Sequence, residues 1–114
     1  YVTFVENYKG VLPILKENLF RLKSIHNYEI IEKDINESKI FLELNKKFDI
    51  IFLDPPYKDK NIKNILKNIN YQKILNKDGI IIIHRHKNEQ DLLPESFKVI
   101  EEKKYGLSKI IFLD

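Results

Sequence analysis

Apolar and polar residues follow two alternating periodicities along the whole chain. Short apolar runs typical of buried strands are separated by segments in which apolar residues recur every three or four positions, as on one face of a helix. The runs predict strands over Tyr1–Val5, Tyr28–Ile31, Phe48–Leu53, Ile80–Ile83, Phe97–Lys104 and Lys109–Leu113. The helical spacing predicts helices over Tyr8–Lys23, Ser38–Leu44, Asp59–Leu75 and Asn88–Leu93, and a turn is predicted at Lys77-Asp78-Gly79.

This order of elements predicts an α/β fold. Strands that alternate with helices form a mostly parallel sheet covered by helices, and the last two strands are predicted to pair as a terminal antiparallel hairpin. The 114 residues fit one domain, residues 1–114. Parallel sheets bind ligands at the carboxyl ends of their strands, so the residues to consider are Glu6, Asp34, Asp54 and His84.

Composition excludes several functional classes. No apolar run approaches the roughly 18 to 20 residues that a transmembrane helix needs. The absence of cysteine excludes disulfide scaffolds, thiolate zinc sites and cysteine nucleophiles. The three glycines, Gly10, Gly79 and Gly106, are too far apart for a GxGxxG or P-loop phosphate cradle.

Positive charge is concentrated in one part of the chain. The formal net charge is +3, and the stretch from Lys58 to Lys77 holds six lysines but only one acidic residue. Such a stretch can attract nucleic-acid phosphates. The alternative is an ordinary solvated helix face. The residues predicted to contact RNA are Lys58, Lys60, Lys63 and Lys67.

The segment Asp54-Pro55-Pro56-Tyr57 carries the most specific chemistry. An apolar strand delivers a carboxylate to its carboxyl end, and two prolines then restrict the backbone and remove two N–H donors. Asp54 and the Pro55 carbonyl could accept hydrogen bonds from an amino group on a planar ring, while Tyr57 stacks on that ring. Acceptors arranged in advance contribute to catalysis through positioning and electrostatics.

On this motif the chain resembles the Rossmann-like S-adenosylmethionine methyltransferases that modify exocyclic amino groups. Over nearly its whole length it is similar to the RsmD family, which methylates guanine N2 in small-subunit rRNA. The similar pieces are Val2–Glu6, Leu15–Leu19, Phe48–Tyr57 and Tyr105–Ser108. The resemblance implies a cytoplasmic enzyme acting on rRNA or on the assembling small ribosomal subunit.

The resemblance also implies roles for individual residues. Glu6 corresponds to the acid that binds the cofactor ribose hydroxyls. Asp34 corresponds to the acid that meets the adenine amino group, with Ile35 packing on the adenine. Asp54, Pro55, Pro56 and Tyr57 correspond to the catalytic motif, which receives a guanine turned out of its stack.

The chain departs from the family at its start. The family's first strand and glycine-rich loop should precede Tyr1, and the chain contains neither, so we expect an N-terminally truncated domain. The absent strand would lie between Tyr1–Val5 and Phe48–Leu53, and the open edges could pair with a second copy. Cofactor binding and methyl transfer by the 114 residues alone are therefore not expected.

The segment His84-Arg85-His86 is a second departure, because relatives carry an acid soon after this strand. The two histidines should point to one side of the strand. Without a third ligand in the sequence, no metal site is predicted. The remaining interpretations are contact of Arg85 or His86 with the RNA backbone, or a solvated strand end.

Two rival functions remain open. An adenine-N6 or cytosine-N4 DNA methyltransferase shares the Asp-Pro-Pro-Tyr chemistry, although such enzymes usually need a separate target-recognition region. A non-catalytic RNA-binding fragment is the alternative from another class, and the absent glycine-rich loop favours it.

Overall fold

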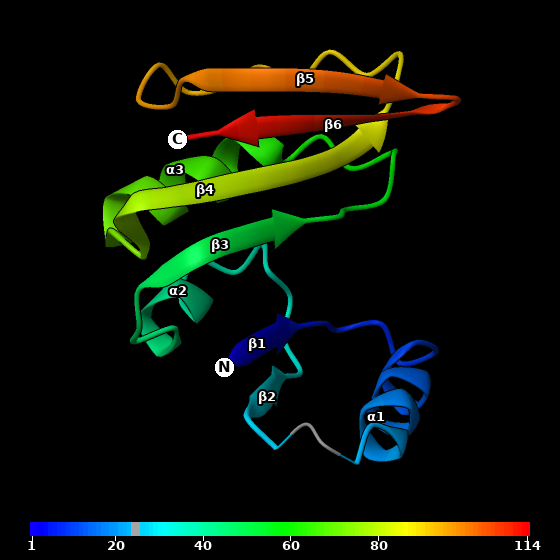
Figure 1. Cartoon of the computed structure of the whole chain (residues 1–114). Coiled ribbons are helices and arrows are strands. Elements are labelled where there is room, and N and C mark those ends of the chain that lie inside the picture. Colours follow the sequence, from blue (N-terminus) through cyan, green and yellow to red (C-terminus); the bar gives the residue numbers. More distant parts are fainter. Residues whose placement is uncertain (24–25) are drawn as a thin grey trace. The chain divides into compact units, whose positions relative to one another are not determined.

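The computed structural model describes residues 1–23 and 26–114, which form two compact units (Figure 1). The first unit comprises residues 1–40 and the second comprises residues 41–114. The prediction of a single domain over residues 1–114 stays a prediction.

The first unit contains a parallel pair of strands and a helix. Strand β1 (Val2–Val5) pairs in parallel with β2 (Tyr28–Ile31), with Val2 opposite Tyr28 and Val5 opposite Ile31. Helix α1 (Leu12–Arg21) connects them and carries Pro13 in its first turn, where a missing N–H is tolerated. Both predicted strands are confirmed, and the helix is shorter than predicted at both ends.

The second unit is a four-stranded sheet in the order β3-β4-β6-β5 (Figure 1). Strands β3 and β4 are parallel, whereas β6 runs antiparallel to both β4 and β5. In the described part of the chain, β3 pairs only with β4, and β1 pairs only with β2. The bounds are β3 Phe48–Leu53, α3 Ile62–Gln72, β4 Leu75–His86, β5 Val99–Tyr105 and β6 Ser108–Leu113, and a short helix α2 covers Ile40–Glu43.

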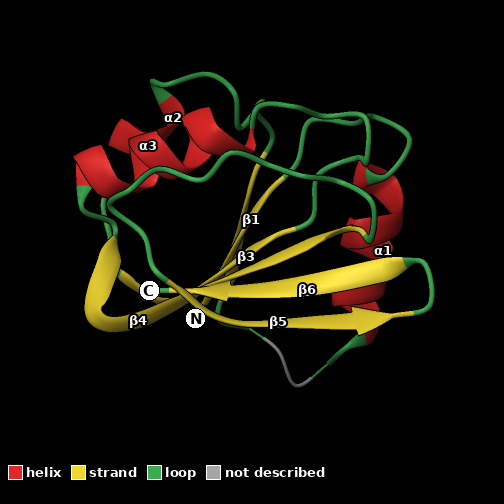
Figure 2. Cartoon of the chain, turned by 90° about the horizontal axis from the view of Figure 1, so that it is seen from above, coloured by secondary structure: helices red, strands yellow, loops and turns green. Residues whose placement is uncertain are grey.

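The core of this unit lies between helix α3 and one face of the sheet (Figure 2). Apolar residues on α3 recur every three or four positions and therefore share one side of the helix, while Lys63 and Lys67 on the other side are exposed. In β4 and β6, alternate residues face the helix. The buried residues from these elements are Ile62, Ile65, Leu66, Ile69, Ile81, Ile83, Ile111 and Leu113.

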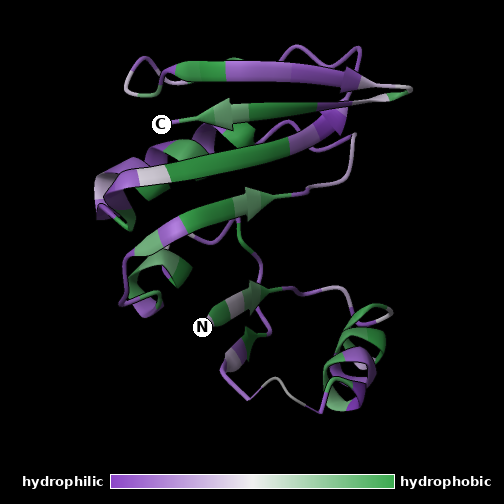
Figure 3. Cartoon of the chain, in the orientation of Figure 1, coloured by the Kyte–Doolittle hydropathy of each residue, from purple (hydrophilic) through white to green (hydrophobic). Residues whose placement is uncertain are grey.

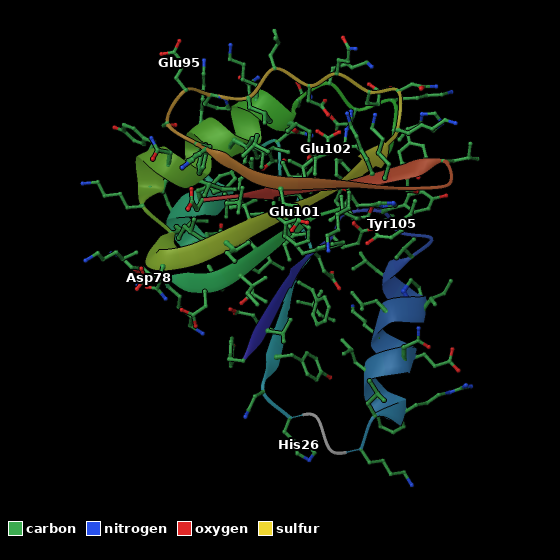
Figure 4. The ribbon with its side chains drawn as sticks, turned by 45° about the horizontal axis from the view of Figure 1, so that its top comes forward. His26, Asp78, Glu95, Glu101, Glu102 and Tyr105 are labelled. Carbon is green, nitrogen blue, oxygen red and sulfur yellow. The ribbon has the colours of Figure 1, made fainter. Side chains whose placement is uncertain are left out.

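Strand β4 begins earlier than predicted, and the turn expected at Lys77-Asp78-Gly79 is wrong. These residues lie inside β4, on its curved first half, where Figure 4 labels Asp78. The register jumps there, since Phe48 is opposite Leu75 but Ile50 is opposite Ile80. The turn-forming residues therefore produce an irregularity within the strand instead of ending it.

The space around Gly79 at this irregularity is tight. A Cβ atom at this position would lie 2.6 Å from Leu75 Cδ1 and 3.0 Å from the Asn76 carbonyl oxygen. Asn76 Nδ2 also donates a 2.7 Å hydrogen bond to Asp49 Oδ1 on β3, which links the two strands across the extra residues. After this point β4 is hydrophobic until it reaches His84 (Figure 3).

The helix predicted over Asn88–Leu93 is also wrong. The chain makes a turn after β4, in which Glu89 N–H donates to the His86 carbonyl, and then continues without regular structure. Asp91 is held by Arg85, and Pro94 disfavours a helical conformation at Leu93. No helix within the described residues is both long and apolar enough to cross a bilayer.

Candidate active site

The candidate site lies at the carboxyl end of β3, beside the last residues of the parallel strand β4, which continues to His86. Leu53 is opposite Ile83 in the register, so the next residue of each strand, Asp54 and His84, are neighbours. His84 Nδ1 donates a 2.8 Å hydrogen bond to Asp54 Oδ1. The Asp54 side chain is 57% exposed, so its second carboxylate oxygen is accessible to a ligand.

Tyr57 lies beside the same pair of residues. Its ring makes edge contacts with the ring of His84, at a centroid distance of 6.0 Å, and with that of His86, at 5.3 Å. The predicted placement of both histidines on one side of the strand is therefore confirmed. The Tyr57 hydroxyl lies 3.2 Å from Ser108 Oγ, within hydrogen-bonding distance, and the residue remains 39% exposed.

The chain turns directly after the two prolines. Asp59 N–H donates a 2.9 Å hydrogen bond to the Pro56 carbonyl, which closes a turn with Tyr57 and Lys58 at its centre. Asp59 Oδ1 in turn accepts from Asn61 N–H at 2.8 Å, just before α3 begins. Among the residues that the structure describes, none donates to the Pro55 carbonyl.

Arg85 is buried, and both interpretations offered for it are wrong. Its side chain is 0% exposed, so it is neither solvated nor free to contact RNA. Its guanidinium donates to both carboxylate oxygens of Asp91, at 2.8 and 3.0 Å. It also donates to the carbonyl oxygens of Pro56, at 3.0 Å, and Asp59, at 2.7 Å.

The sequence carries no local signal for this burial, because the run Ile80–Ile83 before it is apolar at every position. Ile81 and Ile83 are buried, and Arg85 continues their two-residue alternation onto the same face of β4. The partners of Arg85 cannot be read from the sequence either. Pro56 and Asp59 precede it by 29 and 26 residues.

Glu89 lies at the centre of a second charged cluster. Lys60 Nζ lies 2.6 Å from Glu89 Oε2, and Arg85 Nη2 lies 3.6 Å from the same oxygen. The hydrogen bond from Lys60 lowers the pKa of Glu89; partial burial opposes this effect, and the nearby positive charges of Lys60 and Arg85 add to it. The buried Lys109 donates to the Glu89 carbonyl and lies 3.8 Å from Glu102 on β5 (Figure 4).

The predicted RNA-binding lysines therefore differ in their surroundings. Lys60 has an acidic partner in Glu89. For Lys58, Lys63 and Lys67, no acidic partner lies within ion-pair distance in the described ranges, residues 1–23 and 26–114. All four lysines are exposed, and Lys63 and Lys67 are on α3.

The predicted cofactor residues belong to the first unit, and the motif that begins at Asp54 belongs to the second. Glu6 directly follows β1, and its N–H donates to the Ile31 carbonyl at the end of β2. Asp34 follows β2, and its Oδ1 accepts from Asn36 N–H at 2.9 Å and from Asn36 Nδ2 at 3.1 Å. Ile35 beside it is half-buried. The described residues contain no group of three acidic or histidine side chains placed to hold a metal ion.

Solved structures identify the class of fold. A conserved hypothetical protein from Streptococcus pyogenes aligns with a TM-score of 0.84 at 23% identity, over 97% of this chain and 69% of its own. A putative methylase from Haemophilus influenzae aligns with a TM-score of 0.76 at 26% identity, over 97% of this chain and 70% of its own. The predicted α/β fold of the Rossmann-like methyltransferases is confirmed.

The family follows from the sequence comparison. The family model described as Conserved hypothetical protein 95 matches residues 1–114, so the chain belongs to this family, the RsmD family, as predicted. The chain is 28% identical to the ribosomal RNA small subunit methyltransferase D of Buchnera aphidicola over 107 residues. That alignment covers 90% of this chain and 53% of the relative, and the chain spans about half the length of the curated relatives it matches.

Proposed function

We propose that the gene product carrying this chain methylates the exocyclic amino group, N2, of a guanine in small-subunit rRNA, using S-adenosylmethionine. The observation that carries this proposal is the geometry at the end of β3. There the Asp54 carboxylate accepts a 2.8 Å hydrogen bond from His84, and the exposed ring of Tyr57 makes an edge contact with the same histidine.

In this proposal Asp54, Pro55 and Tyr57 each bind one part of the target base. Asp54 Oδ1 is already bound to His84, so Oδ2 accepts one N–H of the amino group. The Pro55 carbonyl accepts the other N–H. The ring of Tyr57, held at its edge by His84 and His86, stacks on the base. Fixing both N–H groups orients the nitrogen lone pair, which is catalysis by positioning.

The residues of the first unit fit a nucleoside cofactor in their chemistry. Glu6 follows the end of β1, and its carboxylate can accept hydrogen bonds from two ribose hydroxyls. Asp34 uses Oδ1 for Asn36, so its other oxygen serves the adenine amino group, with Ile35 against the ring. When bound, S-adenosylmethionine supplies a methyl group activated by a sulfonium.

Two observations support rRNA as the substrate: the names of the relatives and the positive charge that follows the motif. Several relatives are named as ribosomal RNA small subunit methyltransferases. The exposed Lys58 directly follows the motif, and the exposed Lys63 and Lys67 lie on the helix α3 that comes next; all three would contact the phosphates around the target base. Lys60 would contribute less, because Glu89 neutralises it.

The test is methyl transfer by the complete gene product. Labelled S-adenosylmethionine is incubated with small-subunit rRNA, with assembling subunits and with duplex DNA, and the products are digested to nucleosides. We expect N2-methylguanosine from the RNA substrates. Methylated adenine or cytosine from DNA would favour the DNA-methyltransferase alternative, and RNA binding without transfer would favour the non-catalytic one.

Asp54→Ala tests the site itself. Loss of a preorganised polar contact of this kind typically lowers the rate about 10²- to 10³-fold, and the affinity for cofactor should stay within several-fold. A variant that keeps more than half of the wild-type single-turnover rate would reject the role of Asp54. Glu6→Gln is the comparison variant, expected to weaken cofactor binding instead.

A further inference from the structure

The turn after Asp54 is held by a residue that takes no part in the function proposed above. We propose that Arg85 is the positioning residue of this site, and that it fixes the turn Pro56–Asp59 and thereby the placement of Tyr57 and Asp54. The link to catalysis rests on the proposed function, whereas the link to the turn rests on the contacts of Arg85 alone.

The two prolines explain why a separate anchor is needed. Pro55 and Pro56 have no backbone N–H, so this segment can be tied down only through its carbonyl oxygens or through residues beyond it. Arg85 Nη1 donates to the Pro56 carbonyl at 3.0 Å, and Nη2 donates to the Asp59 carbonyl at 2.7 Å. These are the first and last residues of the turn, so one side chain holds both of its ends.

The guanidinium is itself held in a defined orientation. Asp91 accepts from Nε at 2.8 Å and from Nη2 at 3.0 Å, a two-point contact that fixes the plane of the group. Arg85 is 0% exposed and the Asp91 side chain is 7% exposed, so water does not compete for these hydrogen bonds. Lysine cannot replace arginine here, because a single ammonium cannot match this planar set of donors.

The neighbours of Arg85 on β4 contact the same motif through different residues. His84 bonds Asp54, while the rings of His84 and His86 contact the edge of Tyr57. Three consecutive residues of one strand thus reach the motif at the carboxylate, at the aromatic ring and at the backbone of the turn. A shift of about 1 Å in such a constellation can cost about 10²-fold in rate.

The test compares the same substitution at the two arginines of the chain. In the complete gene product, Arg85→Lys removes the planar set of donors, and Arg21→Lys is the control, since Arg21 is an exposed partner of Glu17. The readouts are hydrogen exchange at the Asp59 amide, which closes the turn, and the kcat and KM of methyl transfer. Asp91→Asn serves as a second variant because it loosens the guanidinium without removing it.

For Arg85→Lys we expect about tenfold faster exchange at the Asp59 amide, the effect of losing roughly one net hydrogen bond. The kcat should fall about 10- to 100-fold with the KM for S-adenosylmethionine unchanged. Asp91→Asn should show both changes to a smaller extent, and Arg21→Lys should show neither.

Several results would overturn the proposal. Unchanged exchange in Arg85→Lys would show that Arg85 does not hold the turn, and faster exchange with an unchanged kcat would show a purely structural role. If Arg85→Lys and Asp91→Asn both abolish cooperative unfolding, Arg85 determines the fold and the positioning role is rejected. A result for Asp54→Ala that contradicts the proposed function leaves the exchange measurement intact, so the two failures are distinguishable.

Discussion

Replacement of His84 tests how much the Asp54 carboxylate depends on its neighbour. His84→Leu removes the 2.8 Å hydrogen bond to Asp54 Oδ1. Hydrogen bonds to charged groups contribute about 1.5–3 kcal/mol when protected from water. The side chains of His84 and Asp54 are 26% and 57% exposed, so in the variant water replaces part of the missing hydrogen bond. We therefore take the loss of transition-state stabilisation in His84→Leu to be about 1 kcal/mol. This corresponds to a rate about fivefold lower.

The assay is single-turnover methyl transfer by the complete gene product, with cofactor affinity measured separately. His84→Asn can place an amide N–H near the position of Nδ1, so it should recover most of the rate that His84→Leu loses. His26→Leu is the matched control at an exposed histidine of the first unit (Figure 4) and should have no effect. A full rate in His84→Leu would refute the reasoning. Equal losses in the leucine and asparagine variants would assign the effect to the ring contact with Tyr57 instead.

Four further expectations follow from the described contacts. Tyr57→Ala should impair methyl transfer severely because it removes base stacking worth roughly 1–3 kcal/mol. Tyr57→Phe should have a mild effect because it removes only an exposed hydrogen bond, and equal defects in the two variants would indicate a chemical role for the hydroxyl. Neutralising Lys63 and Lys67 together should lower the slope of log K against log salt for RNA binding by about 0.7 to 0.9 for each phosphate that the variant no longer binds, and an unchanged slope would mean a solvated face. Leu66→Ala, at a 0% exposed position, should cost about 2–5 kcal/mol of unfolding free energy measured by denaturant titration. Because the pKa of Glu89 is lowered in the folded state, its contribution to stability is present above the ordinary glutamate pKa and is lost as the pH falls through the lowered value. In Glu89→Gln, Tm should therefore fall less steeply with decreasing pH than in the wild type, and an equally steep fall would contradict the lowered pKa.

Two strands and the position of the motif could be predicted from the sequence because they are local patterns. The apolar runs predicted β2 and β3 with the bounds Tyr28–Ile31 and Phe48–Leu53 that the structure has. A carboxylate directly after a parallel strand reaches the carboxyl edge of the sheet whatever surrounds it. Asp54 could therefore be placed at the end of β3 from the sequence.

Local signals failed where a neighbouring strand or a distant partner decides the conformation. Lys77-Asp78-Gly79 has the composition of a turn, but pairing with β3 on either side keeps it inside β4. Asn88–Leu93 has helical spacing, but the carboxylate of Asp91 is bound by Arg85 and Pro94 follows closely. In each case tertiary contacts outweigh a weak local preference.

Only the tertiary structure could show what holds the candidate site together. An arginine at the end of a strand is usually solvated, because burying its charge is costly unless the charge is paired and fully hydrogen-bonded. Arg85 is buried because Asp91 supplies the opposite charge and the carbonyls of Pro56 and Asp59 accept its remaining donors. Folding is needed to bring these acceptors to Arg85, since Pro56 and Asp59 precede helix α3 in the sequence and Arg85 follows it. The motif at the end of β3 could thus be located from local pattern, whereas the hydrogen bonds of Arg85 to the turn that follows it depend on long-range contacts.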